Sequence, residues 1–167
     1  MSSRRGDLGR AAGRLLGRAL DRLVRPATRR APTRRPQDAA APDVEYRPRD
    51  DEAADPGEIV WAWVPFDEGD GRGKDRPVLI IGRRDGNLLG LQLSSLDHDL
   101  DAEDEARHGR YWTDIGTGPW DSRGRPSEVR LDRLLDLGPT TVRRIGAALD
   151  RERFDRVIAE TRRVQGW

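Results

Sequence analysis

The sequence contains no cysteine, which excludes disulfide bonds, thiolate metal sites and a cysteine nucleophile. It has only two histidines, so we expect no histidine-rich metal centre and no other cofactor. No apolar run approaches the roughly 18 residues that a membrane span requires. No apolar stretch follows the N-terminal arginines, as one would in a secretory signal peptide. These absences predict a soluble, cytoplasmic protein.

Charged residues are abundant and unevenly distributed. They make up 37% of the 167 residues, against roughly 25% in an ordinary globular domain, and the mean hydropathy is −0.84. Residues 1–36 hold eleven arginines and two aspartates, a balance of +9, so the rest carries −8 of the net +1. The sequence therefore predicts a basic arm joined to a mildly acidic body.

The arm, assigned to residues 1–30, has a helical pattern. Apolar residues recur at three- and four-residue intervals from Leu8 to Val24, which predicts an amphipathic helix over about residues 7–25. Four arginines follow a spacing of four: Arg10, Arg14, Arg18 and Arg22. Two interpretations stay open. The helix contacts an anionic surface, either acidic lipid or nucleic-acid phosphate, or it is a marginally folded tail that docks on the body or on a partner.

A proline-rich stretch separates the arm from the body. Six prolines occur from Pro26 to Pro56, with almost no aliphatic residues among them. Such a stretch buries too little apolar area to offset the entropy of an ordered chain. We expect a disordered linker over residues 31–56 and a folded domain over residues 57–167.

The body alternates short apolar runs with turn residues. These runs predict strands at 58–64, 78–81, 88–95, 111–115 and 129–137. Asp85 and Gly86 predict a hairpin turn that leads into the strand at 88–95. The acidic run 97–105 is expected to be a solvated loop. Two helices are predicted after the last strand, one beginning at Pro139 and one capped by Asp150. The second is expected to end at Gly166, and the helical period places Phe154, Val157, Ile158 and Thr161 on one face of it. Short strands followed by helices predict a mainly β (α+β) fold, a small barrel with C-terminal helices.

Two apparent ligand motifs fail on spacing. Gly69, Gly71 and Gly73 precede Lys74, but a phosphate-binding loop needs Ser or Thr after the lysine, where this chain has Asp75. The acidic run suggests a calcium loop, which requires Gly at its sixth position and Glu at its twelfth. Those positions hold Ala102 and His108.

One pair of residues is suited to binding a phosphate. Arg76 precedes Pro77 at the start of one predicted strand, and Ser94 ends the next, on the face that lacks leucines. A guanidinium and a hydroxyl on adjacent strand ends, beneath a glycine-rich loop, can hold a phosphate and stabilise its charge. The alternative is that both are ordinary residues at strand boundaries.

Four segments resemble the MazF/PemK family of toxins from type II toxin–antitoxin systems. They are PGEIVW (56–61), GKDRPVLII (73–81), LSS (93–95) and SEVRLDRLLDLG (127–138). The resemblance runs from residue 56 to about residue 165. It implies an SH3-like barrel of the MazF/PemK/CcdB kind with helices, generally as a homodimer. It also implies metal-independent, sequence-specific cleavage of single-stranded RNA, silenced by a cognate antitoxin protein.

By this resemblance the family's catalytic arginine falls on Arg76, and its catalytic threonine position falls on Ser94. Serine keeps the hydroxyl but lacks the methyl that restricts χ1. The implied reaction is attack of the ribose 2′-OH on phosphorus, giving a 2′,3′-cyclic phosphate and a 5′-OH. Arg76 would neutralise the developing oxyanion while Ser94 positions the phosphate or the nucleophile. The general base stays open between His98, whose type titrates near pH 6.5, and an unassigned group.

Further residues are candidates for contact with RNA. Phosphate contacts are predicted for Arg72, Lys74, Arg83 and Arg84, and a contact with substrate for Ser95. Trp120 lies in a Gly/Pro-rich loop and is predicted to stack on a base or, alternatively, to pack in the core. The competing function is a non-catalytic toxin on the same barrel that binds DNA or a protein target.

Overall fold

A computed structural model describes residues 42–96, 102–138 and 140–167. The predicted basic arm and the first part of the predicted linker lie outside these residues. In the described part the elements are two helices and eight strands. None of the described helices is long and apolar enough to cross a membrane.

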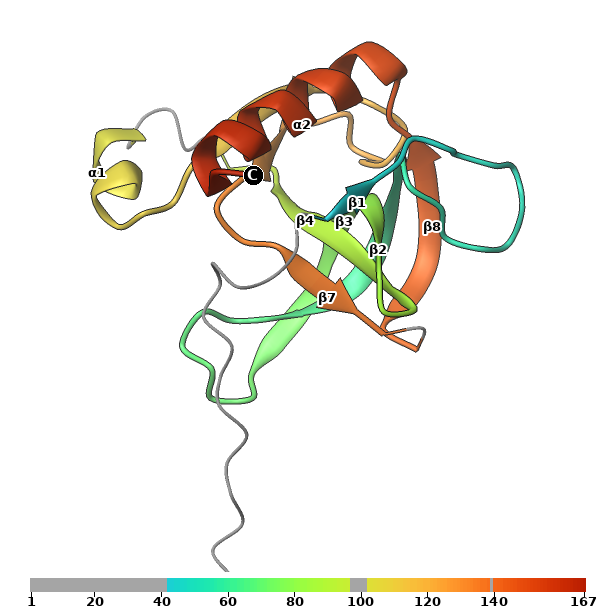
Figure 1. The fold of residues 1–167 in the computed structure, drawn as a ribbon, viewed down its shortest axis with the longest axis horizontal. Helices are drawn as coiled ribbons and strands as arrows, with labels where there is room; N and C mark the ends of the chain where they lie inside the picture. Colours follow the sequence, from blue (N-terminus) through green and yellow to red (C-terminus); the bar gives the residue numbers. More distant parts are fainter. Residues whose placement is uncertain (1–41, 97–101, 139) are drawn as a thin grey trace, which may run out of the picture. The chain divides into compact units, whose positions relative to one another are not determined.

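The strands form one antiparallel sheet in the order β5-β6-β4-β3-β2-β8, with β1 paired to β3 and β7 to β4 (Figure 1). The strands are β1 (Asp43–Val44), β2 (Glu58–Pro65), β3 (Gly73–Arg84), β4 (Asn87–Ser94), β5 (Trp112–Gly116), β6 (Ser127–Arg130), β7 (Leu135–Leu137) and β8 (Val142–Ala148). The helices are α1 (Ala102–Arg107) and α2 (Arg151–Gln165). The predicted mainly β fold is therefore confirmed.

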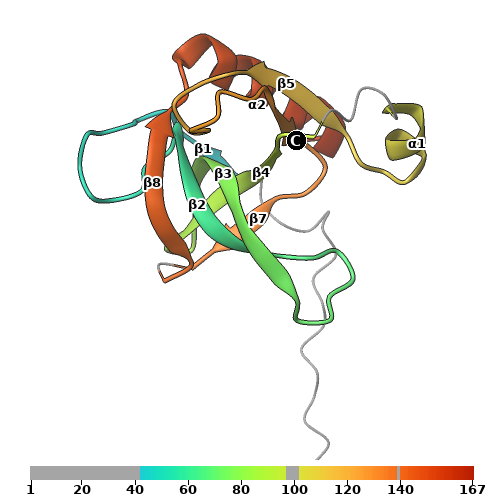
Figure 2. The ribbon, with the colours of Figure 1, turned by 180° about the vertical axis from the view of Figure 1, so that it is seen from behind.

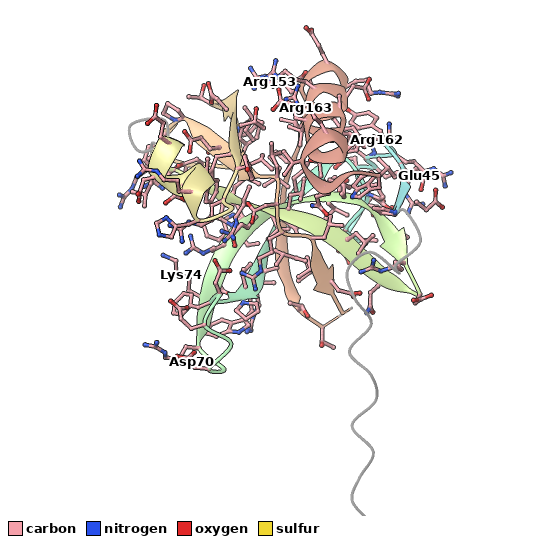
Figure 3. The ribbon with its side chains drawn as sticks, turned by 60° about the vertical axis from the view of Figure 1, so that its left-hand side comes forward. Glu45, Asp70, Lys74, Arg153, Arg162 and Arg163 are labelled. Carbon is pink, nitrogen blue, oxygen red and sulfur yellow. The ribbon has the colours of Figure 1, made fainter. Side chains whose placement is uncertain are left out.

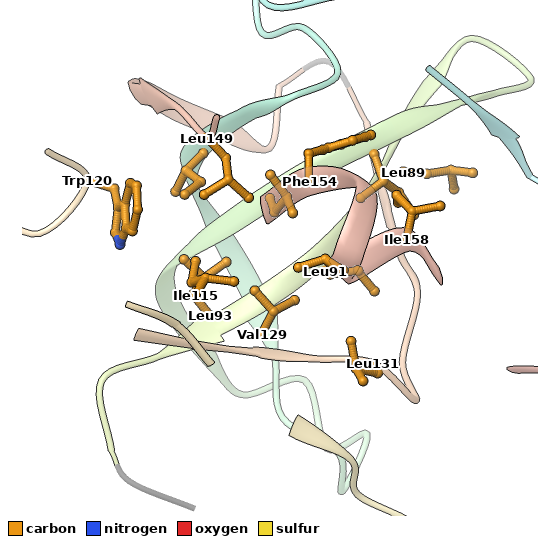
Figure 4. Packing of buried hydrophobic residues seen from close by; sticks show 14 residues of the cluster. Leu89, Leu91, Leu93, Ile115, Trp120, Val129, Leu131, Leu149, Phe154 and Ile158 are labelled. Carbon is orange, nitrogen blue, oxygen red and sulfur yellow. The ribbon is translucent and has the colours of Figure 1, made fainter. Parts of the chain in front are cut away.

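Two apolar clusters lie on the two faces of this sheet. The cluster under α2 contains alternate leucines of β4 and the apolar stripe of the helix: Leu89, Leu91, Leu93, Phe154, Val157 and Ile158 (Figure 4). Figure 2 shows α2 and β5 side by side, and the Arg156 guanidinium donates to the Asp114 carbonyl of β5 at 3.3 Å. Each fully buried aliphatic or Phe side chain contributes about 1.5–3 kcal/mol, so this cluster fixes which face of β4 is covered.

The opposite face encloses the second cluster. Its members come from β2, β3, β4 and β7: Val60, Ala62, Val64, Val78, Ile80, Leu88, Leu135 and Leu137. Strands β3 and β7 both pair with β4, and all three strands contribute side chains to this cluster. Because side chains alternate along a strand, Gln92 and Ser94 of β4 are on this second face, away from α2. The predicted common face of Gln92 and Ser94 is thus confirmed, but this face does not lack leucines, since Leu88, Leu135 and Leu137 lie on it.

Helix α2 has the predicted ends and buried face. The Asp150 carboxylate accepts the Arg153 N–H at 3.0 Å, and Gly166 ends the helix in the left-handed region with φ of 77°. Its buried residues are Phe154, Val157, Ile158 and Thr161, the four that the helical period selects. Local signals therefore located this element correctly.

The first predicted C-terminal helix is wrong. Val142–Ala148 forms β8 and pairs antiparallel with β2, Ile59 opposite Ala147 and Ala62 opposite Val142. The spacing of apolar residues also suits a helix, but an unpaired β2 would leave a row of exposed backbone groups. Gly146 lets β8 lie close to β2, since a Cβ at this position would be only 2.7 Å from the Ile59 carbonyl oxygen.

Two smaller differences concern the acidic run and the last predicted strand. Residues 102–107 form the short helix α1 instead of a loop, with acidic residues in its first turn and Arg107 in its last, which complements the helix dipole. The predicted strand 129–137 is two strands, β6 and β7, which pair with different parts of β4.

Residues 42–56, within the predicted linker, are part of the folded body. Val44 of β1 pairs with Gly82 of β3. The Tyr46 hydroxyl donates to the Leu149 carbonyl at 2.9 Å, and its ring lies 5.0 Å from that of Phe154. Composition misled the prediction because a few well-placed side chains are enough to order a proline-rich segment.

Candidate active site

Arg76 and Ser94 come from neighbouring strands and share a face of the sheet. Val78 of β3 lies opposite Gln92 of β4 in the antiparallel register. Arg76 is two residues before Val78, and Ser94 is two residues after Gln92. Alternation then puts Arg76 and Ser94 on the face of the second apolar cluster. Both residues line a cavity of about 280 Å³. The structure thus brings together the two residues that the sequence singles out.

Ser94 is nearly enclosed. It is 7% exposed, lies opposite Glu128 of β6, and its hydroxyl oxygen accepts the Leu96 N–H at 3.1 Å. A hydroxyl that accepts one hydrogen bond still has its proton to donate. The exposed Ser95 follows it and lines the same cavity.

Arg76 is half-buried, and its guanidinium makes no hydrogen bond or ion pair with any residue that the structure describes. Burial lowers the pKa of Arg76, the charge of Asp67 opposes this change, and the nearby Arg130 and Arg133 lower it further. An arginine nevertheless stays protonated in proteins. A partly desolvated cation is costly unless it is paired, so this guanidinium is suited to receive an anion.

A second cavity, of about 400 Å³, also has Arg76 in its wall. Its lining is rich in arginine: Pro65, Phe66, Asp67, Glu68, Arg72, Arg76, Gln92, Arg130 and Arg133. Arg76 therefore lies between a cavity that contains Ser94 and a cavity that contains three more guanidinium groups. Both cavities can accommodate parts of one anionic polymer.

Arg130, which sequence reasoning missed, is the most enclosed cation of this second cavity. Its side chain is 10% exposed and lies between two carboxylates, with Nη2 2.8 Å from Asp132 Oδ2 and Nη1 2.7 Å from Asp67 Oδ2. Burial opposes its charge, but hydrogen bonds to Asp132 and Asp67 outweigh burial and raise its pKa. The available signal was the alternation of Glu128 and Arg130 with Val129 and Leu131.

The predicted phosphate-binding residues divide into two groups. Lys74 and Arg72 lie on or beside the β2–β3 hairpin, where Figure 3 shows Lys74 and Asp70 far from α2. Arg72 is exposed, and its Nε lies 2.6 Å from Asp70 Oδ2. Arg83 and Arg84 lie at the other end of β3. They pair with Asp55 and Asp136, so they do not belong to this site.

Trp120 and His98 are the remaining predicted site residues, and the structure describes only Trp120. Trp120 is 4% exposed and packs in the cluster under α2, and its Nε1–H donates to the Ser127 hydroxyl at 3.1 Å. Its packing in the core is therefore confirmed. Trp120 also lines the cavity that contains Arg76 and Ser94, and its stacking on a base stays a prediction. His98 lies outside the described residues. Among those residues, no three His, Asp or Glu side chains are grouped as a metal ion requires.

Comparison with known proteins identifies the family. No curated protein matches the chain. The solved structure titled "Crystal structure of MazE-MazF (Form-II) from Deinococcus radiodurans" is similar at 15% identity and a TM-score of 0.47, covering 70% of this chain and 98% of that chain. A family model described as PemK-like, MazF-like toxin of type II toxin-antitoxin system matches residues 55–164. The resemblance noted in the sequence is thereby confirmed: the chain belongs to the PemK/MazF toxin family.

Proposed function

We propose that this protein is the toxin of a type II toxin–antitoxin pair and acts as a metal-independent endoribonuclease on single-stranded RNA. The observation that carries the proposal is the pairing of Arg76 with Ser94 at one cavity. Arg76 supplies a positive charge with no described partner, and Ser94 supplies a hydroxyl. Membership of the toxin family supports the same function.

The reaction needs charge stabilisation and two proton transfers. The ribose 2′-oxygen forms a bond to the adjacent phosphorus as its proton passes to a base, and the bond from phosphorus to the 5′-oxygen breaks. A proton on the 5′-oxygen completes a 5′-OH product, and the other product is a 2′,3′-cyclic phosphate. His98 remains the predicted candidate for proton transfer. The need for a 2′-OH separates RNA from DNA.

Each residue of the pair has a distinct part in this scheme. The Arg76 guanidinium binds the non-bridging oxygens, on which negative charge grows in the transition state. The Ser94 hydroxyl donates to the phosphate or to the attacking oxygen and fixes its position. Lys74 and Ser95, which line the same cavity, hold the neighbouring part of the RNA chain.

The partners follow from the same proposal. A cognate antitoxin protein would silence the enzyme by covering these cavities, and the active form would be a homodimer. The protein would act in the cytoplasm, where its RNA substrate is. Contact of residues 7–25 with an anionic surface remains a separate prediction.

The enclosure of Ser94 favours the competing function. Ser94 is 7% exposed and its hydroxyl already accepts the Leu96 N–H, which limits its contact with a substrate phosphate, whereas a non-catalytic toxin needs no such contact. In that case the arginine-lined cavities would bind DNA or an acidic protein target without cleavage.

Incubation of the full chain with matched RNA and DNA single strands in EDTA distinguishes the two functions. An endoribonuclease gives discrete RNA fragments on a denaturing gel and leaves DNA intact. The new 5′ ends should accept a label from polynucleotide kinase without prior phosphatase treatment, because they carry a 5′-OH. Binding of the RNA without cleavage would contradict the proposal and support the competing function.

A further inference from the structure

One carboxylate in the second cavity is held by two arginines. Asp67, in the loop between β2 and β3, places Oδ2 2.7 Å from Arg130 Nη1 and Oδ1 2.7 Å from Arg133 Nη1. The Arg133 guanidinium also donates to the Pro65 carbonyl at 3.0 Å. Both oxygens of one anionic group are thus engaged by separate guanidinium groups, and Arg76 lies in the same wall.

The exposure of these side chains shows which of them form the wall. Arg130 is 10% exposed and Arg133 is 25% exposed, whereas Asp67 is 46% exposed. The two cations are therefore built into the cavity, and the carboxylate enters from the solvent side. Residues 67–72 of its loop are all exposed, so few packing contacts oppose a shift of Asp67.

Asp67 carries its negative charge at neutral pH. Burial raises the pKa of Asp67, but the hydrogen bond from Arg130 and the charges of Arg130 and Arg133 prevail and lower it. An ionised carboxylate and a phosphate present the same feature to arginine, a pair of oxygens that accept two charge-assisted hydrogen bonds. A phosphate binds arginine in the same planar geometry.

We propose that Asp67 occupies a binding site for an RNA phosphate, and that bound RNA displaces this carboxylate from Arg133 and Arg130. The identification of the anion as RNA rests on the proposed function. The site that Asp67 vacates lies beside Arg76, so a phosphate bound there would be near the phosphate that is cleaved. Asp67 would also weaken the binding of anions that cannot engage the rest of the site.

Replacement of Asp67 by asparagine tests this exchange directly. The probe is a mixed-sequence 2′-O-methyl RNA single strand, which cannot be cut by 2′-OH attack, and its binding to the full chain is followed by fluorescence anisotropy. Removal of one repelling charge a few ångströms from a phosphate should tighten binding about 3- to 10-fold at low salt. The salt dependence should steepen by roughly 0.7 in log–log slope, because the positive charge that faces the RNA at this site rises by one.

Asp155→Asn is the control for charge. It removes the same charge from the protein, but Asp155 pairs with Arg151 at an exposed position of α2 and lines neither cavity. Its effect on binding should stay within about twofold, as expected for an exposed pair. Equal gains in affinity from Asp67→Asn and Asp155→Asn would show that only net charge matters and would overturn the proposal.

Arg133→Gln completes a double-mutant cycle. It should weaken binding, and in its presence Asp67→Asn should lose most of its gain, because the two residues act on one phosphate. Weaker or unchanged binding by Asp67→Asn in a protein that melts at the wild-type temperature would overturn the exchange. If Asp67→Asn lowers the melting temperature, its affinity cannot be interpreted, and the salt dependence of RNA binding by Arg133→Gln tests the proposal instead. The proposal requires the log–log salt slope of Arg133→Gln to be shallower than that of the wild type. An unchanged slope would overturn it.

This binding test is independent of catalysis. A wild-type protein that binds the 2′-O-methyl strand but cuts no RNA contradicts the proposed nuclease function alone. Tighter binding by Asp67→Asn would still establish the phosphate site in that case.

Discussion

Replacement of Asp55 by asparagine tests whether residues 42–56 belong to the folded body. The buried Asp55 carboxylate accepts hydrogen bonds from Arg49 Nε at 2.7 Å and Nη2 at 2.9 Å, and from Arg83 Nη2 at 3.2 Å. Arg49 is in this segment and Arg83 is in β3, so the carboxylate joins the segment to the sheet. Asparagine keeps the shape and removes the charge.

The expected loss is about 2 kcal/mol of unfolding free energy at pH 7. Hydrogen bonds to charged groups contribute about 1.5–3 kcal/mol each, and removing one partner of a buried ion pair costs about 3–5 kcal/mol. The cost here is below that range because Arg49 and Arg83 are each about half exposed, so water can solvate them once the charge is gone.

The loss should depend on pH in a defined direction. The hydrogen bond from Arg49 lowers the pKa of Asp55 and outweighs the opposing effect of burial, with Arg83 adding to it. A carboxyl whose folded pKa lies below its unfolded value near 3.8 stabilises the fold above that value. Its contribution is lost as pH falls through the folded pKa. The difference between wild type and Asp55→Asn should therefore be constant above about pH 5 and shrink below about pH 4.

Urea unfolding of the full chain, followed by tryptophan fluorescence, measures both quantities. Asp51→Asn is the control, because Asp51 Oδ2 lies 3.6 Å from the same Arg49 Nε at an exposed position, where a pair contributes at most about 1 kcal/mol. If Asp55→Asn destabilises no more than Asp51→Asn, or if its effect persists undiminished near pH 3, the reasoning is refuted.

Two further substitutions test the core and the role of Trp120. Phe154→Ala should lower the unfolding free energy by about 3–5 kcal/mol, because Phe154 is buried between α2 and the sheet; a loss below 1 kcal/mol in the same urea assay would contradict this packing. Trp120→Phe removes the hydrogen bond to Ser127 and should cost about 1–3 kcal/mol while leaving the affinity for the 2′-O-methyl strand unchanged. A large loss of affinity with normal stability would instead support the prediction that Trp120 stacks on a base.

Sequence patterns located the elements whose signals are local. The alternation in β4, the stripe and caps of α2, and the hairpin at Asp85 and Gly86 depend on neighbouring residues, and all are present. At that hairpin both residues have positive φ, 51° and 83°, as its turn requires. Residues 142–148 were mispredicted because the free edge of β2, about 80 residues away in the sequence, decides their conformation.

The same difference between local and distant signals explains which features of the candidate site the sequence predicts. Arg76 and Ser94 flank one hairpin, so the alternation of side chains along its two strands is enough to predict that they share a face of the sheet. Asp67 is separated from Arg130 by 63 residues, and their contact depends on how the β2–β3 loop folds over β6. No periodicity in the sequence reports such a contact.

The proposed nuclease depends on the guanidinium of Arg76 to stabilise the charge that develops on the cleaved phosphate. The direct test is the single-turnover rate of RNA cleavage by Arg76→Ala, with Arg84→Ala as the control from the far end of the same strand. We expect Arg76→Ala to cut about 10²- to 10³-fold more slowly, and Arg84→Ala to cut at the wild-type rate. Cleavage by Arg76→Ala at a rate close to that of the wild type would contradict the account.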